Sequence, residues 1–156
     1  MPHLYGDPEK CTGCRICELY CAQQKEKVMN PKRARLRIFR GYRSDRIETC
    51  RQCVDAPCLE SCPEEAIARN QKTGIVFVNE TKCDGCGVCV VACPYEMIWV
   101  NPDRGKAIKC DLCKQCIAQC PTDALSVSQK EWSALKDSDI AQPASSLETS
   151  SSESSL

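Results

Sequence analysis

Alternating polar and apolar residues predict a short β-strand in the first third of the chain. Residues 33–40 alternate basic and apolar side chains. This period of two puts Ala34, Leu36 and Ile38 on one face of a half-buried strand and turns the arginines outward. The outward arginines are expected either to guard a sheet edge against pairing or to dock an acidic partner.

Two apolar–turn–apolar patterns further along the chain predict β-hairpins. Residues 66–68 and 75–78 flank a turn that contains Asn, Lys and Gly. Residues 97–100 and 106–108 flank a turn that contains Pro and Gly. Both patterns are typical of hairpins, and residues 46–49 predict one more short strand.

An internal repeat links these hairpins to cysteine. A Cys-Pro dipeptide, two further residues and an apolar pair occur at Cys62-Pro63, Cys93-Pro94 and Cys120-Pro121. The proline prevents a preceding helix from continuing, and the apolar pair begins a strand. Cys21 is followed by Ala22 instead, so a polar helix is expected to continue toward residue 28. Residues 128–131 have the form of a capping box, which predicts a short helix through Leu135.

The cysteines themselves form four runs that together use all 16 cysteines of the chain. The third run spells C-x2-C-x2-C-x3-C-P, and the second is widened by residues 54–57. In two-cluster bacterial ferredoxins three cysteines of such a run bind one cubane and the cysteine before proline binds the neighbouring cluster. Sixteen thiolates at four per cluster predict four 4Fe-4S clusters. The expected ligands are Cys11, Cys14, Cys17, Cys21, Cys50, Cys53, Cys58, Cys62, Cys83, Cys86, Cys89, Cys93, Cys110, Cys113, Cys116 and Cys120.

Two other uses of cysteine are less favoured. Dense cysteine in a short chain is typical of disulfide scaffolds, but residues 1–7 carry no signal-peptide pattern. Structural zinc takes two C-x2-C pairs separated by a longer spacer, and a third cysteine two residues on is superfluous for a tetrahedral ion.

Composition limits what else can hold the fold together. The 156 residues suit one domain, but only two Phe, two Trp and four Tyr are available for a core. The clusters are therefore expected to act as the core, and the chain without iron is expected to be largely unfolded.

Charge and hydropathy exclude several classes of partner. Lys plus Arg and Asp plus Glu are both 21, so the formal charge is zero and neither nucleic acid nor direct membrane insertion is expected. Bound clusters would add negative charge, about two per oxidised cubane. Six basic residues in or beside the runs are expected either to offset this charge or to be ordinary surface charge: Lys10, Arg15, Arg51, Lys82, Lys109 and Lys114. Thiolates and clusters favour a reducing compartment, so a cytoplasmic location is expected.

The four runs, the widened second run and the sequence Lys109-Cys110-Asp111-Leu112-Cys113 resemble the four-cluster electron-transfer subunits of DMSO reductase type. The resemblance covers about residues 7–128 and implies an α+β fold with two pseudo-symmetric bacterial-ferredoxin-like lobes. It also implies crossed ligand sets. By that pattern the sets are Cys11, Cys14, Cys17 with Cys120; Cys110, Cys113, Cys116 with Cys21; Cys50, Cys53, Cys58 with Cys93; and Cys83, Cys86, Cys89 with Cys62.

The expected function of the chain is one-electron transfer by the clusters, without a catalytic site of its own. The only histidine is His3, and the chain has no phosphate-binding glycine loop or nucleophile arrangement. The resemblance implies a relay subunit beside a large catalytic subunit, favours a tungsten or molybdenum aldehyde oxidoreductase, and allows a flavin or NAD-linked subunit. Hydrogenase, carbon monoxide dehydrogenase and formate dehydrogenase complexes stay open, as does a free polyferredoxin. We expect a cluster domain over residues 1–131 and a Ser-rich docking tail over residues 132–156.

Overall fold

A computed structural model describes residues 1–129 of the chain. The strands are β1 (His3–Gly6), β2 (Leu36–Phe39), β3 (Arg46–Thr49), β4 (Ile67–Arg69), β5 (Val76–Val78), β6 (Ile98–Asn101), β7 (Lys106–Lys109) and β8 (Leu125–Ser128). The helices are α1 (Ile16–Glu26), α2 (Pro57–Glu60) and α3 (Val88–Ala92), with short 3-10 turns η1 (Pro31–Arg33) and η2 (Ile117–Gln119). These short strand pairs and few helices make an α+β fold of the ferredoxin-like kind.

The described strands pair as four two-stranded antiparallel sheets. Three of them, β2–β3, β4–β5 and β6–β7, are the strands and hairpins that the apolar pattern predicts. The fourth joins the two ends of the described chain, because β1 pairs with β8 in the register His3–Ser128 to Gly6–Leu125. Strand β1 was not predicted, since its four residues show no alternation.

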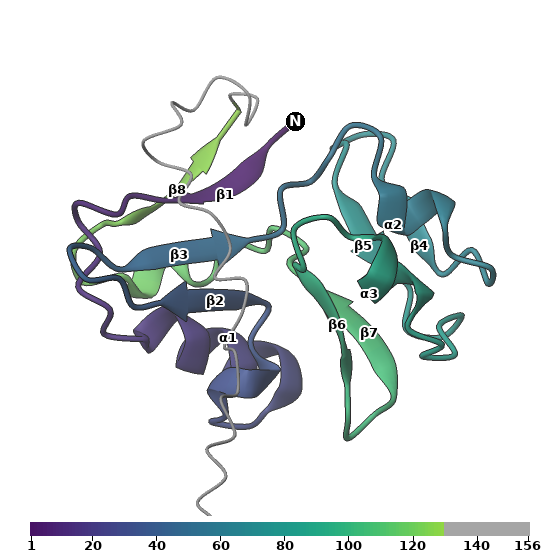
Figure 1. Ribbon diagram of the computed structural model, residues 1–156, viewed down its shortest axis with the longest axis horizontal. Helices are drawn as coiled ribbons and strands as arrows, with labels where there is room; N and C mark the ends of the chain where they lie inside the picture. The colour runs from purple at the N-terminus through teal and green to yellow at the C-terminus, as the bar shows by residue number, and fades with distance from the viewer. Residues whose placement is uncertain (130–156) are drawn as a thin grey trace, which may run out of the picture.

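Apolar side chains collect in two separate clusters, each beneath two of the sheets. Residues near both ends of the chain form one, which includes Leu4, Leu36 and Leu125. Residues 56–107 supply the other, which includes Ile67 and Ile98. Figure 1 shows the same division, with β1, β8, β2, β3 and α1 on the left and β4 to β7, α2 and α3 on the right. We call these parts the terminal half and the central half.

The β2 strand and the residues just before it have the predicted phase, but the arginines of this segment do not all face solvent. Ala34, Leu36 and Ile38 are buried, as expected. The Arg33 and Arg35 side chains are only 15% and 12% exposed, because both contact acidic residues of the same chain. Arg37 lies over the Trp99 ring, 4.2 Å from its centroid. The expectation of outward arginines is therefore wrong at these positions, which contact the central half instead.

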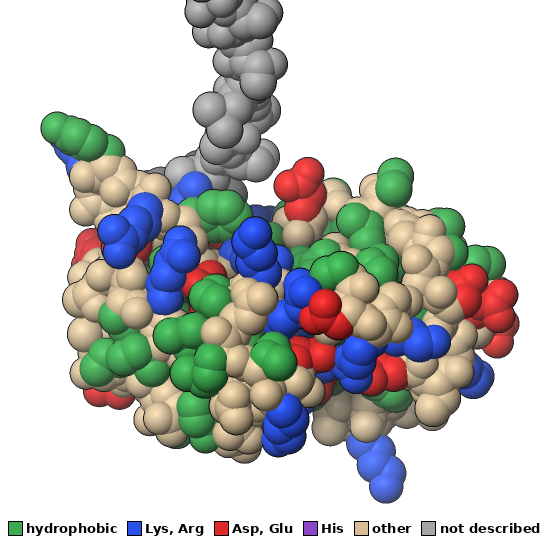
Figure 2. Space-filling view, turned by 90° about the horizontal axis from the view of Figure 1, so that it is seen from below, with side chains coloured by type: hydrophobic (Ala, Val, Ile, Leu, Met, Phe, Trp, Pro, Cys, Tyr) green, Lys and Arg blue, Asp and Glu red, His purple; other side chains and the backbone are tan. Residues whose placement is uncertain are grey.

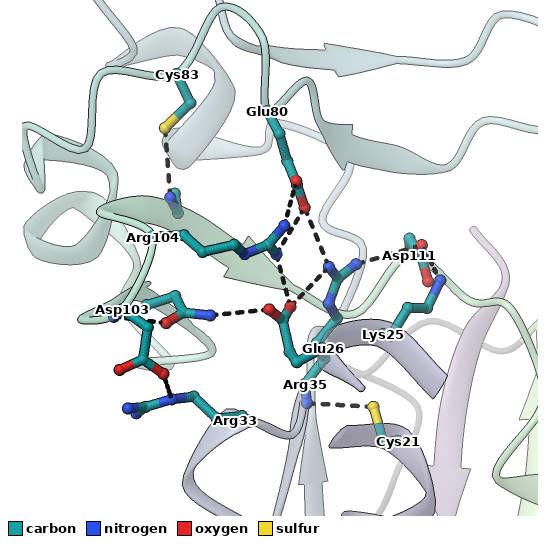
Figure 3. A network of polar contacts seen from close by, with 12 residues as sticks. Cys21, Lys25, Glu26, Arg33, Arg35, Glu80, Cys83, Asp103, Arg104 and Asp111 are labelled. Carbon is teal, nitrogen blue, oxygen red and sulfur yellow. Dashed lines mark hydrogen bonds and ion pairs between the residues drawn. The ribbon is translucent and has the colours of Figure 1, made fainter. Parts of the chain in front are cut away.

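A network of polar contacts joins the two halves (Figure 3). Arg35 lies within 3.4 Å of Glu26 in α1 and of Glu80 beyond β5. Arg104, in the β6–β7 turn, contacts the same two carboxylates at 2.8 and 2.7 Å. Asn101 adds a hydrogen bond to Glu26 of 2.9 Å. Figure 2 shows acidic and basic side chains intermingled in the middle of one face of the molecule.

Two expectations concern residues beyond the described part. The helix predicted from the capping box runs past Gln129, and the docking tail of residues 132–156 lies wholly outside the described residues. No helix within residues 1–129 is both long and apolar enough to cross a membrane.

Candidate metal centres

The four cysteine runs share one backbone conformation. In each run the residue just before the second cysteine is left-handed, with φ of 65, 50, 81 and 56° at Gly13, Gln52, Gly85 and Leu112. The residue two positions before the third cysteine is left-handed as well, with φ of 62, 36, 79 and 64° at Arg15, Ala56, Gly87 and Lys114. Changes of handedness within a loop turn successive N–H groups to one side, which forms a concave anion site of the kind found around iron-sulfur clusters.

Most of these left-handed positions are not glycine. A residue with a Cβ loses about 1–2 kcal/mol in this conformation, so five of the eight positions are strained, namely Arg15, Gln52, Ala56, Leu112 and Lys114. Local strain of this kind persists where the surrounding structure imposes it, and it is concentrated at functional sites. The sequence alone signals the loop only where glycine occupies it.

The last cysteine of three runs lies in a second repeated turn. Each Cys-Pro is followed by a left-handed acidic residue, with φ of 48, 54 and 51° at Glu65, Glu96 and Asp123. This turn directs the next backbone N–H at the cysteine sulfur, over 3.3 Å from Ala66 to Cys62, 3.4 Å from Met97 to Cys93 and 3.2 Å from Ala124 to Cys120. Hydrogen bonds to cluster sulfurs are one of the factors that set reduction potentials.

Cys21 obtains the same kind of donor from a different element. It has no proline after it and lies inside α1, as the sequence predicts. The Arg35 N–H, just before β2, donates to its sulfur over 3.3 Å. Cys83 accepts a similar bond of 3.3 Å from the Ala107 N–H in β7.

Cysteines from different runs gather around shared cavities. One cavity is lined by Cys50, Cys53, Cys58 and Cys93. A second is lined by Cys21, Cys110, Cys113 and Cys116, and a third by Cys62, Cys83, Cys86 and Cys89. Around Cys11, burial raises the thiol pKa and nearby Asp45, Cys120 and Cys14 add to the rise. None of the cysteines, all of which lie within residues 1–129, forms a disulfide. In each of these three cavities the structure brings three cysteines of one run together with the last cysteine of another run.

No group of three or more Cys, His, Asp or Glu side chains within residues 1–129 has the spacing of a single-ion site. Thiolates that each bind a different iron of a cube stand farther apart than the four ligands of one zinc ion. The cysteine groups therefore surround a volume and do not converge on a point.

Burial dominates the electrostatics of the inner cysteines. It raises the pKa of Cys17 and of Cys116 to about 12, with further repulsion between these two thiols. It raises the pKa of Cys58 and Cys89 to about 11. Burial opposes the thiolate at Cys120 too, but hydrogen bonds from Thr122 and Ala124 lower the pKa of that thiol. Buried thiolates need positive charge beside them, which iron supplies when it binds.

Each cysteine group has a cysteine close to a member of another group. Cys17 of the first group is close enough to Cys116 of the second for charge repulsion from Cys116 to raise the Cys17 pKa. Cys110 of the second is a neighbour of Cys50 in the third, and Cys58 of the third is a neighbour of Cys89. Cys89 lines the fourth group's cavity. The step from second to third group is also the step from the terminal to the central half.

Of the six basic residues singled out in the sequence, one is fully buried. Lys109 is 2% exposed, at the end of β7. Lys10 and Arg15 have side chains 59% and 47% exposed and pair with nearby Asp7 and Glu18. Arg51 lies 3.8 Å over the Tyr95 ring, and Lys82 and Lys114 are exposed. Sequence reasoning missed Gln52, a 2% exposed amide whose role depends on contacts far along the chain.

Comparison with known proteins now adds the family. The model of the 4Fe-4S dicluster domain matches residues 46–130, more than half of the chain. This chain belongs to the 4Fe-4S dicluster domain family. A second model, of a 4Fe-4S binding domain, matches residues 8–24. The protein therefore binds 4Fe-4S clusters and is related to iron-sulfur electron carriers.

The relatives of this dicluster protein include named electron carriers. It is 40% identical over 65% of its length to the polyferredoxin-like subunit of an aliphatic sulfonate oxidoreductase from Pyrococcus furiosus, of which the match covers 59%. It is 38% identical to the putative electron transport protein YsaA of Escherichia coli, and the match covers 67% of this chain and 69% of YsaA. It is also 38% identical to the Escherichia coli electron transport protein HydN, and that match covers 59% of this chain and 55% of HydN. The chain thus spans little more than half the length of two of these three relatives.

Solved structures add only a weak likeness. A chain of the BamBC active site complex of benzoyl coenzyme A reductase matches 92% of this chain and 83% of its own length, with a TM-score of 0.47 and 23% identity.

Proposed function

We propose that this dicluster protein is a non-catalytic relay subunit that holds four 4Fe-4S clusters in a row within a multisubunit oxidoreductase. The observation that carries the proposal is the crossed grouping of cysteines, four to a group. The ligand sets are Cys11, Cys14, Cys17 and Cys120; Cys21, Cys110, Cys113 and Cys116; Cys50, Cys53, Cys58 and Cys93; and Cys62, Cys83, Cys86 and Cys89. The two halves are then pseudo-symmetric ferredoxin-like lobes with two clusters each.

The residues present fit such clusters. The left-handed loop positions aim backbone N–H groups at the negative charge, and five cysteine sulfurs accept a further backbone N–H. Buried apolar side chains such as Leu4 and Ile98 limit the access of water, which influences reduction potential. When bound, each cluster takes up one electron and gives it back, with no bond made or broken in the protein.

Iron content tests the number of clusters. Four cubanes predict about 16 iron atoms and as many sulfides per chain after anaerobic reconstitution. Cys21→Ser should perturb the same paramagnetic centre as Cys110→Ser, and Cys11→Ser a different one. An iron content near eight, or a common centre for Cys21 and Cys11, would contradict the proposal.

A catalytic partner is supported by the relative named as a subunit of an aliphatic sulfonate oxidoreductase. For this chain the proposed partner is the large subunit of a tungsten or molybdenum aldehyde oxidoreductase, in a reducing cytoplasm. Affinity purification of the full chain from its own cells, followed by metal analysis of what copurifies, tests this. Tungsten or molybdenum supports the proposal, whereas nickel would assign the subunit to a hydrogenase or carbon monoxide dehydrogenase.

A free polyferredoxin is the second candidate, because two of the relatives are named simply as electron transport proteins. Purification of the chain without any larger subunit would favour it. In the relay-subunit proposal, residues 1–131 bind the clusters and residues 132–156 dock the partner. Truncation after Gln129 should keep all clusters and weaken assembly with the partner, and unchanged assembly would show that the tail is not part of the interface.

A further inference from the structure

Lys109 carries a buried charge that has no carboxylate to balance it. Its side chain lies at the end of β7 and is 2% exposed. The ammonium donates to the Val76 carbonyl of β5 over 2.6 Å. Within residues 1–129 no Asp or Glu oxygen lies within the 4.0 Å of a salt bridge from it, whereas Lys25, Arg33, Arg35 and Arg104 all have such partners.

An ammonium in this position is costly unless negative charge lies nearby. It has three N–H donors and one of them reaches a carbonyl, and an unpaired buried charge destabilises a fold by several kcal/mol. The cavity beside Lys109 is the one lined by Cys50, Cys53, Cys58 and Cys93. Burial raises the pKa of Cys58, and the charge of Lys109 opposes that rise. The nearest negative charge that the ammonium can balance is therefore that of the thiolates and of what they hold.

The other cavities differ in charge. The cavity of the second set is lined by Lys25, Arg35 and the exposed Lys114, and both Lys25 and Arg35 contact Asp111, at 2.6 and 3.5 Å, which offsets their charge. The cavity of Cys62, Cys83, Cys86 and Cys89 is lined by Asp84 and, among the described residues, by no lysine or arginine, although the Lys106 ammonium donates to the Cys83 carbonyl. Arg51 lines the same cavity as Lys109, so the third set faces two cations.

We propose that Lys109 is the counter-ion of the cluster held by Cys50, Cys53, Cys58 and Cys93 and raises the reduction potential of that centre. This inference rests on the ligand sets assigned above. Reduction adds one negative charge, which an ammonium in a region of low dielectric stabilises more than the oxidised state.

Lys109→Gln tests this by removing the charge while keeping a donor for the Val76 carbonyl. In a redox titration of the full-length, cluster-loaded protein followed by EPR, one midpoint potential should fall by at least about 59 mV, a tenfold change in a one-electron equilibrium. The centre that shifts should be the one that Cys53→Ser abolishes. Lys72→Gln, at an exposed lysine in the β4–β5 turn, is the matched control and should leave all potentials unchanged.

The outcomes separate the inference from the proposed function. Four clusters with unaltered potentials in Lys109→Gln, or an equal shift in all centres, would overturn the counter-ion role and leave the ligand sets intact. A wild-type iron content below four clusters would instead overturn the ligand sets. If Lys109→Gln fails to load the third centre alone while Lys109→Arg loads it, the charge requirement is supported directly.

Discussion

The side-chain amide of Gln52 donates to the Cys110 carbonyl over 2.9 Å and so joins the second cysteine set to the third. Its oxygen accepts the Val76 N–H at 2.7 Å. Gln52 lies between Cys50 and Cys53 and has a left-handed backbone with φ of 50°. One buried residue thus contributes to the loop of one proposed centre and contacts a proposed ligand residue of the next.

Gln52→Ala should lower the stability of the loaded protein. It leaves the Cys110 carbonyl and the Val76 N–H buried without their partner, which costs about 1–3 kcal/mol per group. Thermal unfolding under anaerobic conditions, followed by circular dichroism, measures the effect. Gln71→Ala in the exposed β4–β5 turn is the control, and equal melting of the two variants would show that the amide does not stabilise the junction.

Two glycines of the third run should respond differently to alanine. At Gly85 a Cβ would collide with the backbone carbonyl of Gly105, whereas at Gly87 it would meet no atom within 4 Å. Both are left-handed, with φ of 81 and 79°, so each alanine also costs about 1–2 kcal/mol. Gly85→Ala should lose the cluster of Cys83, Cys86, Cys89 and Cys62, and Gly87→Ala should retain it. Equal cluster content, measured by EPR, would rule out the steric explanation.

Glu26→Ala should loosen the contact between the halves. The Glu26 side chain is 4% exposed and accepts bonds from Arg35, Arg104 and Asn101. Its loss should cost about 1–3 kcal/mol and speed hydrogen exchange in the β6–β7 hairpin. Glu9→Ala, at an exposed position, should do neither. Slow exchange retained in Glu26→Ala would mean that other contacts hold the halves together.

Lys27→Gly should stabilise the protein. Lys27 follows α1 with φ of 59°, and its N–H caps the helix by donating to the Gln23 carbonyl over 3.1 Å. Glycine is the preferred residue at this position because it lacks the Cβ penalty, so a gain of about 1 kcal/mol is expected. Lys27→Ala should stay within about 0.5 kcal/mol of wild type. Equal melting temperatures for the two variants would refute the strain at this cap.

Removal of iron should unfold the chain. The largest fully buried apolar side chains are Leu4, Leu36, Ile98, Ile108 and Val76, which is a thin core for 129 described residues. Because structural metal sites contribute folding free energy outright, an anaerobic chelator should abolish cooperative thermal melting. Native-like cooperative melting of the iron-free chain would contradict this.

The sequence predicts local features of this fold better than its long-range contacts. The strand phase at Leu36 and Ile38 follows from a period of two, which needs only neighbouring residues. The partners of Arg35 cannot be predicted from neighbouring residues, because Glu80 and Asp111 lie 45 and 76 positions away in the sequence. Left-handed positions without glycine, such as Leu112, also escape sequence reasoning, since nothing in the residue type favours that conformation. The crossed cysteine sets were available only through the family resemblance.

The pairing of β1 with β8 has a consequence for the order of assembly during synthesis. The central half is built from a continuous stretch of chain, so it can close as soon as β7 has been made. The terminal half needs β8, and Cys120 is synthesised roughly 100 residues after Cys11. Closing so long a loop is slow and entropically costly, and cysteines exposed meanwhile are open to oxidation. With the proposed ligand sets, we therefore expect iron delivered to the nascent chain to fill the central centres first, and the completed central half to bring Cys110 into position for the terminal ones.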